Sequence, residues 1–390
     1  MRVAMIGQKG LPAAYGGVER HVEELSTRLA KRGIEVTVYN RRWFSDYQKK
    51  TFQGIRVVTT PTLHTKHFDT ITHTLTSTIH ALITHHDIIH FHGVGPSLLS
   101  WIPRIFSPHT VVITTFHCID RKHKKWGGFA RIMLRLGEWS TCRFAHKIIA
   151  VSKTIAAYAL AVYDCTAIYI PNGINPVKPI TNSEQIIQNQ FGLTHNNYVA
   201  VVTRLIPHKG IHHLITAFTG LNTKKKLVIV GGGHFTDLYV KRLHELTHGD
   251  KRIIFTGFQS GAALHALYEH AALVVQPSEL EGLSISLLEA MNYGRPLLAS
   301  DIDENREALS DYGWYFKSGN SADLARQLKK LLATPRITLE RRAKIGQVYV
   351  NNLFNWDTIT SDTLHLYEKL VAVKPGKKRR AVAAAFRLAK

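Results

Sequence analysis

Short runs of aliphatic and β-branched residues alternate along the chain with stretches in which apolar residues recur every three or four positions. The first pattern predicts buried strands and the second predicts amphipathic helices. In the first half, this predicts strands at Arg2–Gly7, Glu35–Asn40, Ile55–Thr60, Asp87–His92, Thr110–His117 and Lys147–Val151, with helices at Val18–Lys31, Ile71–Thr84 and Phe129–Phe144. This alternation is typical of parallel α/β units.

A second set of the same units follows a turn cluster at Ile170-Pro171-Asn172-Gly173 and a polar linker that we expect to reach about Asn197. It predicts strands at Tyr198–Thr203, Leu227–Gly231, Arg252–Thr256, Leu273–Gln276 and Pro296–Ser300, with helices at His212–Phe218, Thr236–Thr247, Gly261–His270, Ser284–Asn292 and Ser321–Ala333. We therefore expect an α/β protein with two Rossmann-like parallel-sheet domains and a cleft between them. Ligands of such sheets bind at the carboxyl ends of strands, so the loops there are the candidates for chemistry.

Length and composition narrow the class of protein. A chain of 390 residues with 45% apolar and 20% charged residues is long enough for two or three cores, which excludes disordered, collagenous and disulfide-scaffold proteins. Cys118, Cys142 and Cys165 are too widely spaced for a C-x-x-C motif and are expected to be free thiols in a reducing compartment. No apolar run has membrane-spanning length and no signal-peptide core opens the chain, so we expect a soluble cytoplasmic protein. A peripheral position on the inner face of the plasma membrane stays open.

The net charge of +22 is less ordinary. Residues 1–171 have a basic surplus of 12, and seven of the basic residues of the second half lie between Lys374 and Lys390. A field of this sign attracts nucleic acid, anionic lipid headgroups or phosphorylated substrates. Charge alone does not choose among these partners.

A glycine-rich segment follows the first strand. It contains Gly7-Gln8-Lys9-Gly10 and Tyr15-Gly16-Gly17-Val18-Glu19-Arg20 and leads into a helix, whose N-terminal amides favour an anion such as a phosphate. The segment lacks the G-x-G-x-x-G spacing and no acidic residue closes the second strand, which disfavours a dehydrogenase. The alternative is that this segment is a tight turn that positions the helix and binds no anion.

Two cations follow the first strand of the second half, in Thr203-Arg204-Leu205-Ile206-Pro207-His208-Lys209-Gly210. Arg204 and Lys209 lie five positions apart on a loop constrained by Pro207 and Gly210. They can converge on one diphosphate, to which arginine offers a planar fork and lysine a point charge. The alternative is a pair of solvated surface cations.

The stretch from Pro277 to Met291 is the most informative. Glu281 lies in the loop after an apolar strand, Gly282 is at the start of the following helix, and Glu289 lies within that helix among Leu, Ala and Met residues. Carboxylates accept strong hydrogen bonds from sugar hydroxyls, so both glutamates are candidates for binding a sugar. The alternative is a capped helix with one surface glutamate, but it does not explain well why a carboxylate lies among apolar neighbours.

Taken together, these motifs resemble the retaining glycosyltransferases of family 4. The resemblance rests on Glu281-x7-Glu289, Arg204…Lys209-Gly210, Gly16-Gly17-x-Glu19-Arg20, Ile170-Pro171-Asn172-Gly173 and Val151-Ser152, and it extends to about Lys369. It implies the GT-B fold and a nucleotide-sugar donor. Ile6-Gly7-x-Lys9-Gly10-Leu11-Pro12-x3-Gly16-Gly17, and Lys125-Trp126-Gly127 leading into Leu134-x-Leu136-Gly137-Glu138, are also similar to rhamnosyltransferase-like enzymes of bacterial surface polysaccharide synthesis.

The resemblance also implies a domain layout. It gives an acceptor domain over residues 1–171, a nucleotide-sugar donor domain over 172–355, a helix near Trp356–Leu370 within 356–373 that crosses back to the first domain, and a basic tail over 374–390. Thr203 and His208 depart from the family pattern, which puts the detail of their loop in doubt and leaves the cation pair unaffected.

Site roles follow by position from the same resemblance. It implies that Arg204 and Lys209 hold the donor diphosphate, that Glu281 binds the donor sugar, and that Glu289 binds the ribose. It places His117 at the family's active-site histidine near the donor sugar. The remaining donor-binding positions that it implies are Gly16 and Gly17, over the diphosphate from the opposite domain, and the amides of Gly282, Leu283 and Ser284.

The implied reaction is a front-face displacement with retention, for which the sequence offers no convincing nucleophile; Glu281 in that role is the weaker interpretation. We expect no cofactor and no metal, because a cation pair replaces the divalent ion. The 23 histidines include His90 and His92 on one strand face, which by themselves do not make a zinc site. Apart from His117, most histidines are expected on the polar surface.

The segment Arg121–Arg143 is basic, with Trp126, Phe129, Ile132 and other apolar residues interleaved. It can lie on anionic headgroups and bring a lipid-linked acceptor to the enzyme, or it can be a core-facing amphipathic helix with a solvated basic face. Both interpretations stay open. The tail is expected to be solvated rather than a second membrane contact.

The sequence thus favours a glycosyltransferase that moves a sugar from a nucleotide donor to a lipid-linked surface glycan. The alternatives are a GT-B nucleotide-sugar epimerase and a basic nucleic-acid- or membrane-binding protein without catalysis. Nucleic acid is not an expected partner, because binding to it would leave Glu281 and Glu289 unexplained.

Overall fold

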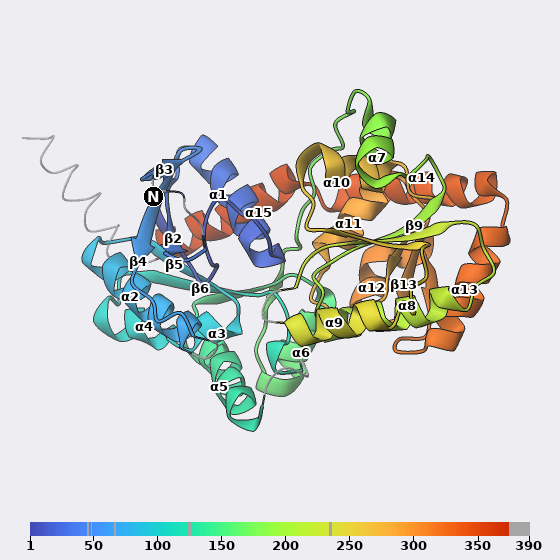
Figure 1. Ribbon diagram of the computed structural model, residues 1–390. Helices are drawn as coiled ribbons and strands as arrows, with labels where there is room; N and C mark the ends of the chain where they lie inside the picture. Colours follow the sequence, from blue (N-terminus) through green and yellow to red (C-terminus); the bar gives the residue numbers. More distant parts are fainter. Residues whose placement is uncertain (45–46, 48, 66–67, 123–126, 234–235, 374–390) are drawn as a thin grey trace, which may run out of the picture. The chain divides into compact units, whose positions relative to one another are not determined.

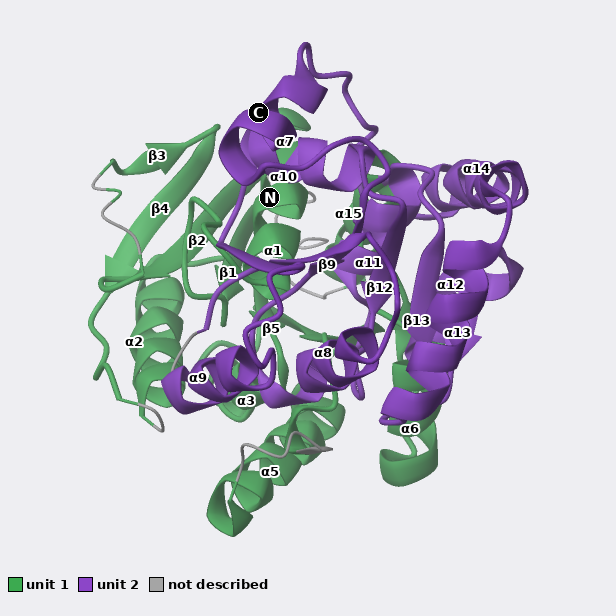
Figure 2. Cartoon of the chain, turned by 45° about the vertical axis from the view of Figure 1, so that its right-hand side comes forward, with its two compact units in different colours: residues 1–172, 356–390 green, residues 173–355 purple. Residues whose placement is uncertain are grey.

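The computed structural model describes the chain except for residues 45–46, 48, 66–67, 123–126, 234–235 and 374–390. The chain forms two compact units, which are coloured separately in Figure 2. Unit 1 comprises Met1–Asn172 and Trp356–Lys390, and unit 2 comprises Gly173–Asn355. The basic tail and the residues Lys124 to Trp126 of the basic segment lie outside the described residues.

Unit 1 is built on an eight-stranded sheet with the order β3-β4-β2-β1-β5-β6-β7-β8. Its strands are β1 (Arg2–Ile6), β2 (Glu35–Arg41), β3 (Thr51–Phe52), β4 (Ile55–Thr60), β5 (Ile88–His92), β6 (Val111–Phe116), β7 (Lys147–Ala150) and β8 (Ile168–Tyr169). Of the strands that the structure describes in this sheet, only the edge strand β3 runs antiparallel to its neighbour. The central strands are buried on both faces, as their continuous apolar runs require.

Helices cover the sheet of unit 1 (Figure 1). They are α1 (Gly17–Lys31), α2 (Asp69–Ile83), α3 (Val94–Ser97), α4 (Trp101–Phe106), the 3-10 helix η1 (Asp120–Lys122), α5 (Gly128–Phe144), α6 (Lys153–Tyr163) and α15 (Trp356–Ala372). The last helix, α15, lies beside α1 in Figure 1. Trp356 and Tyr367 of α15 join Val22 and Leu25 of α1 in one buried core.

Unit 2 is built on a six-stranded parallel sheet with the order β11-β10-β9-β12-β13-β14. Its strands are β9 (Tyr198–Val202), β10 (Lys226–Val230), β11 (Ile253–Gly257), β12 (Leu273–Gln276), β13 (Leu297–Ser300) and β14 (Trp314–Phe316). Numbered within the unit, this order is 3-2-1-4-5-6, which is the Rossmann order.

The helices of unit 2 are α7 (Ser183–Phe191), α8 (Ile211–Thr219), α9 (Asp237–Glu245), α10 (Gly261–Glu269), α11 (Ile285–Asn292), α12 (Asp303–Leu309), α13 (Ser321–Ala333) and α14 (Arg336–Leu353). Two 3-10 helices, η2 (Pro207–Lys209) and η3 (Ser310–Tyr312), complete the described elements. Buried residues of β9, α8 and α13, such as Val199, Leu214 and Leu328, form the core on one side of the sheet.

The expected pair of parallel Rossmann-like domains is confirmed. The expected polar linker up to Asn197 is wrong, because α7 forms within it and buries Ile187. This helix is rich in Gln and Asn, so its amphipathic pattern is weak, and Gly192 ends it in the left-handed conformation. The three cysteines are free thiols, as expected. Among the helices formed by the described residues, none combines the length and the apolar character needed to cross a membrane.

Candidate functional site

The central strands of unit 2 bring two candidate loops together. β9 pairs with β12, while the connections from these two strands lead to opposite sides of the sheet order. This is the topological switch point, where ligands of open parallel sheets bind at the carboxyl ends of the strands. The loops that leave β9 and β12 at this edge are the predicted loops that contain Lys209 and Glu281.

Lys209 and Glu281 form an ion pair in the interior of unit 2. The Lys209 ammonium donates a hydrogen bond to Glu281 Oε1 at 2.5 Å, and the two residues are only 9% and 7% exposed. Gln276 Nε2, at the end of β12, donates to the same oxygen at 2.9 Å. Burial raises the pKa of the Glu281 carboxyl, but the charge of Lys209 and the hydrogen bonds outweigh it, so that pKa lies below its ordinary value. Glu281 is therefore an ionised carboxylate held by a buried cation.

The backbones of the loop that contains Lys209 and of the β12–α11 loop pass very close to each other. Gly210 has a φ of +67°, and a Cβ at this position would lie 1.9 Å from the Pro277 carbonyl oxygen. The Glu279 amide donates to the His208 carbonyl at 2.8 Å. Only glycine allows the chain after Lys209 to pass so close to the β12–α11 loop. The local backbone thus positions Lys209 next to Glu281.

Arg204 lies in a different environment from Lys209. Arg204 is exposed and forms no ion pair with a carboxylate of the described residues. The next two residues, Leu205 and Ile206, are buried, and Thr236 Oγ1 donates to the Leu205 carbonyl at 2.9 Å. The loop therefore directs one predicted cation inward and leaves the other in contact with solvent.

The helix after Glu281 begins later than the sequence predicts. Gly282 does not start it: α11 begins at Ile285, with Ser284 as its N-cap. Ser284 Oγ accepts from the Leu287 amide at 3.4 Å and from Gln276 Nε2 at 3.2 Å. Gly282 and Leu283 are buried residues of the preceding loop. Glu281 is thus outside the helix, and its position follows from the loop rather than from helical periodicity.

Glu289 is half-buried on α11, next to two tyrosines. The rings of Tyr268 and Tyr293 stack with their centroids 5.2 Å apart. Burial and then the Glu289 carboxylate raise the pKa of both tyrosines, which places the carboxylate beside them. Glu289 therefore lies in a polar and aromatic environment on α11, eight positions after Glu281 in the chain.

The glycine-rich loop of unit 1 uses several of its amides internally. The Lys9 amide donates to Glu19 Oε1 at 3.1 Å, and the Ala13 amide donates to Glu23 Oε2 at 2.6 Å. Gly16 has a φ of +105°, and a Cβ there would lie 1.9 Å from Glu19 Oε2. Gly16 precedes α1 and Gly17 is its first residue, one position before the predicted start at Val18. The Lys9 and Ala13 amides bind carboxylates of the chain itself, so an anion would have to use other donors.

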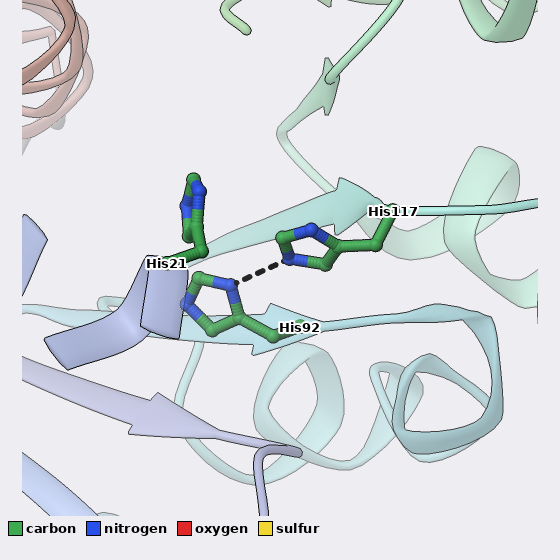
Figure 3. A group of neighbouring side chains, drawn as sticks. All are labelled: His21, His92 and His117. Carbon is green, nitrogen blue, oxygen red and sulfur yellow. Dashed lines mark hydrogen bonds between the residues drawn. The ribbon is translucent and has the colours of Figure 1, made fainter. Parts of the chain in front are cut away.

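A cluster of three histidines lies at the carboxyl edge of the unit 1 sheet (Figure 3). His92 ends β5, His117 follows β6 and His21 comes from α1. His92 Nδ1 and His117 Nε2 are hydrogen-bonded at 3.1 Å, and the rings of His21 and His117 meet edge to face at 4.8 Å between centroids. His21 Nδ1 is 2.9 Å from Asn172 Oδ1. The predicted active-site histidine His117 is thus one member of a group.

The histidines of this group are neutral near pH 7. Burial lowers the pKa of His21 to about 4, and burial followed by the repulsion of His21 lowers the pKa of the adjacent His90 to about 3. Burial and neighbouring imidazoles hold the pKa values of His92 and His117 well below the usual range. The expected position on the polar surface is wrong for seven of the described histidines. The buried histidines are His21, His73, His86, His90, His92, His208 and His270.

The sequence did not point to several residues that surround the β12–α11 loop and the histidine cluster. Gln276 joins Glu281 to Ser284, and Asn172 holds His21. One signal could have found Gln276, which is a polar residue at the last position of an otherwise apolar buried strand, where the parallel fold places binding groups. His21, one turn into a helix, carries no comparable signal.

The helix α5 bears on one of the two interpretations left open for the basic segment, the core-facing helix. Its buried face consists of small and polar residues, including Gly137 and Ser140. Its apolar side chains form an exposed stripe at helical spacing, with exposed fractions of 76% for Phe129, 60% for Ile132, 44% for Leu136 and 50% for Trp139. Arg131 and Arg135 are exposed beside this stripe. The apolar side chains named here therefore do not face the core.

Comparison with known families gives each unit a counterpart. The family model "Glycosyltransferase Family 4" matches residues 15–178, and the model "Glycosyl transferases group 1" matches residues 183–348. The chain is a glycosyltransferase of the GT-B type. Its two units correspond to the two matched segments, and the Lys209–Glu281 pair lies in the second.

Known relatives of this glycosyltransferase cover nearly its whole length. A phosphatidyl-myo-inositol mannosyltransferase of Mycobacterium leprae is 27% identical, over 94% of this chain and 96% of the relative. Among solved structures, sucrose-phosphate synthase of Thermosynechococcus elongatus has a TM-score of 0.82 at 22% identity, covering 96% of this chain and 100% of that one. Anabaena HepE in complex with UDP-glucose has a TM-score of 0.78 at 21% identity, covering 95% and 100%. The structural matches show that the fold is shared.

Proposed function

We propose that this glycosyltransferase transfers a sugar from a nucleotide-sugar donor bound in unit 2, with retention, to a lipid-linked glycan acceptor of cell-surface polysaccharide synthesis. The observation that carries the proposal is the buried Lys209–Glu281 pair at the switch point of the unit 2 sheet. Support for the donor comes from HepE, whose structure is described in complex with UDP-glucose. Support for a lipid acceptor comes from the phosphatidyl-myo-inositol mannosyltransferase relative.

The proposed chemistry places positive charge where the leaving group becomes negative. When the bond to the anomeric carbon breaks, charge develops on the departing diphosphate. An ammonium has three N–H donors, and the bond to Glu281 uses one of those of Lys209. Lys209, the exposed Arg204 and the amides at the start of α11 would stabilise that charge without a metal. Removing one such pre-placed donor typically costs about 2.7–4 kcal/mol of barrier.

The other roles follow from the resemblance. Glu281 would bind hydroxyls of the donor sugar, Glu289 the ribose, and the segment Gly282–Ser284 would lie near the phosphate. The roles given to Gly16, Gly17 and His117 stay predictions of the resemblance. A neutral His117 suits hydrogen bonding to a sugar hydroxyl better than charge stabilisation.

Retention is proposed to proceed by front-face displacement. Glu281 Oε1 accepts hydrogen bonds from Lys209 and Gln276, which suits a carboxylate that positions the sugar better than one that attacks it. Analysis of the product's anomeric proton by NMR tests this step. A product with the configuration of the donor supports it, and an inverted product contradicts it.

The donor site is tested with a double variant, Lys209→Met/Glu281→Gln, because either single alanine leaves a buried charge unpaired. Transfer of radiolabelled sugar should fall by at least about 100-fold, while the unfolding temperature changes little. The matched control is Arg336→Met/Glu340→Gln, which removes a partly exposed ion pair on α14 of the same unit and should keep full activity. Wild-type stabilisation by UDP, GDP or dTDP in thermal unfolding identifies the base.

Full transfer by the double variant would refute the donor-site assignment. Epimerisation of the donor in the absence of any acceptor would favour the epimerase alternative. Transfer that persists after chelation of metals is expected from a reaction in which lysine and arginine neutralise the leaving group.

The exposed stripe of α5 supports a membrane-associated acceptor. Phe129, Ile132 and Trp139 can enter a headgroup region while Arg131 and Arg135 meet anionic lipid. Co-sedimentation with phosphatidylglycerol vesicles tests this: Phe129→Ser/Ile132→Ser should weaken binding at least tenfold. The control, Ile337→Ser/Val348→Ser, removes two exposed apolar side chains of α14 and should bind as the wild type does. Equal binding by both variants would exclude α5 as the membrane contact.

A further inference from the structure

Two adjacent histidines at the start of α8 face a single carboxylate. His212 and His213 follow Lys209-Gly210, and Glu279 lies two residues before Glu281 in the β12–α11 loop. Glu279 Oε1 is 3.3 Å from His213 Nε2 and 3.9 Å from His212 Nε2. One ligand atom from each of the three residues lies within 4.8 Å of the other two. None of the predicted donor-site roles uses these side chains.

The second nitrogen of each imidazole is held by a hydroxyl. His212 Nδ1 is 2.9 Å from the Tyr239 hydroxyl, and His213 Nδ1 is 3.0 Å from Ser321 Oγ. These contacts fix both rings so that both Nε2 atoms face Glu279. Histidines that bind metals are usually oriented in this way by a hydrogen bond to their other nitrogen.

We propose that His212, His213 and Glu279 form a binding site for a divalent transition metal of the zinc type. Ligand bonds of about 2.0–2.2 Å in a tetrahedron give ligand separations of roughly 3.3–3.6 Å. The separation of 3.3 Å between His213 and Glu279 fits this range, and the separation of 3.9 Å between His212 and Glu279 is slightly longer. Two imidazoles and one carboxylate are a ligand set found in zinc sites. All three residues are only partly buried, which leaves a fourth position for water.

The three-histidine cluster of unit 1 is a weaker candidate for the same ion. His21 and His92 are buried and the cluster contains no carboxylate, so a divalent charge there would be poorly compensated. Glu279 supplies one negative charge at the unit 2 site, and solvent reaches it. The charge and the access therefore favour the site on α8.

A metal at this site would join the two segments that position the Lys209–Glu281 pair. α8 follows Lys209 directly, and Glu279 is already tied to His208 by a backbone hydrogen bond. Coordination would strengthen the contact that His213 and Glu279 already make between α8 and the β12–α11 loop. The site is expected to stabilise the fold around the proposed donor site and not to take part in the transfer step.

Zinc binding to the metal-free full-length protein, measured by isothermal titration calorimetry, tests the proposal. The wild type should bind one equivalent that His213→Ala loses, and Glu279→Gln should weaken this binding at least tenfold. His248→Asn is the matched control, because it removes an exposed imidazole of the same unit at a backbone position with positive φ that asparagine tolerates. Tyr239→Phe and Ser321→Ala should each weaken binding about 10–100-fold.

Cobalt binding gives a second readout. A tetrahedral Co²⁺ spectrum in the wild type and in His248→Asn, absent in His213→Ala and Glu279→Gln, would support the site. The same stoichiometry and affinity in all four proteins, or no binding to the wild type, would overturn it. If His213→Ala proves unstable without metal, Glu279→Gln, which keeps the shape of the side chain, decides the question. None of these measurements uses a sugar donor, so their failure is distinct from failure of the proposed transfer.

Discussion

The switch points of the two sheets share their strand order but differ in their electrostatics. In unit 1 this edge holds neutral imidazoles with neutral partners: His21 with Asn172, and His90 with Thr115 and Tyr367. In unit 2 it holds a buried ammonium and a buried carboxylate, Lys209 and Glu281. Topology therefore determines where polar groups gather, and the partner of each group determines whether it keeps a charge. A buried imidazole without a carboxylate loses its proton, whereas a buried carboxylate with a lysine stays ionised.

The largest expected effect comes from breaking the charged pair on one side only. Lys209→Ala leaves Glu281 buried without its cation and should lower the free energy of unfolding by about 3–5 kcal/mol. The double variant Lys209→Met/Glu281→Gln removes both charges and should cost much less. Urea denaturation of the three proteins measures both differences. A single variant no less stable than the double would show that the pair does not depend on mutual neutralisation.

A smaller effect is expected from the backbone that brings the pair together. Gly210→Ala combines an unfavourable positive φ with a Cβ placed 1.9 Å from the Pro277 oxygen, so a cost of about 2–4 kcal/mol is expected. Gly192→Ala is the control in the same unit: its φ is +62°, but a Cβ there meets no atom within 4 Å, and about 1 kcal/mol is expected. Equal losses in thermal unfolding would mean that the contact with Pro277 is unimportant.

The pH dependence of stability should differ between the groups at the carboxyl edges of the two sheets. When the pKa of a histidine is lower in the folded than in the unfolded state, the unfolded state takes up the proton at a higher pH. Stability therefore decreases as pH falls from about 6.5 towards the pKa of the folded state. For His21, with a folded pKa of about 4, the slope is about 1.4 kcal/mol per pH unit over that window. His21→Gln should reduce the slope by that amount. The contribution of Glu281, whose pKa is lowered, is lost only at lower pH, below about 4.5.

The smallest predicted effect compares two helix caps. Ser152 caps α6 of unit 1 by accepting from the Ile155 amide at 3.2 Å, and Ser284 caps α11 of unit 2. Each alanine variant should lose about 1 kcal/mol of stability. Only Ser284→Ala should also lower transfer, because Ser284 Oγ accepts from Gln276, which holds Glu281. Kinetic assays of both variants check this. Equal activity of the two variants would show that the cap at Ser284 does not affect the donor site.

The fold was predictable because most buried strands are continuous apolar runs. The bounds of Ile55–Thr60 and Leu273–Gln276 agree with the prediction to the residue. The helix α7 was missed because its polar sequence gains stability mainly from tertiary packing of Ile187, which no local pattern reveals.

The candidate site was predictable only in part. Lys209 and Glu281 are 72 positions apart, and the sequence marked both residues without indicating that they pair with each other in the interior. The histidine cluster was missed because imidazole is polar on average, yet becomes a tolerable buried group once hydroxyl and amide partners accept its hydrogen bonds. These partners come from distant segments, so they are a property of the tertiary structure.

The membership of α15 in unit 1 has a consequence for synthesis of the chain. Trp356, Ile359, Leu366, Tyr367 and Val371 complete a core whose other buried members are all made more than 180 residues earlier. A ribosome therefore releases the last piece of the first unit only after the whole second unit has emerged. Until then Val22, Leu25 and their neighbours lack their cover, and the nascent chain carries an apolar patch that makes this stage the natural point for chaperone binding.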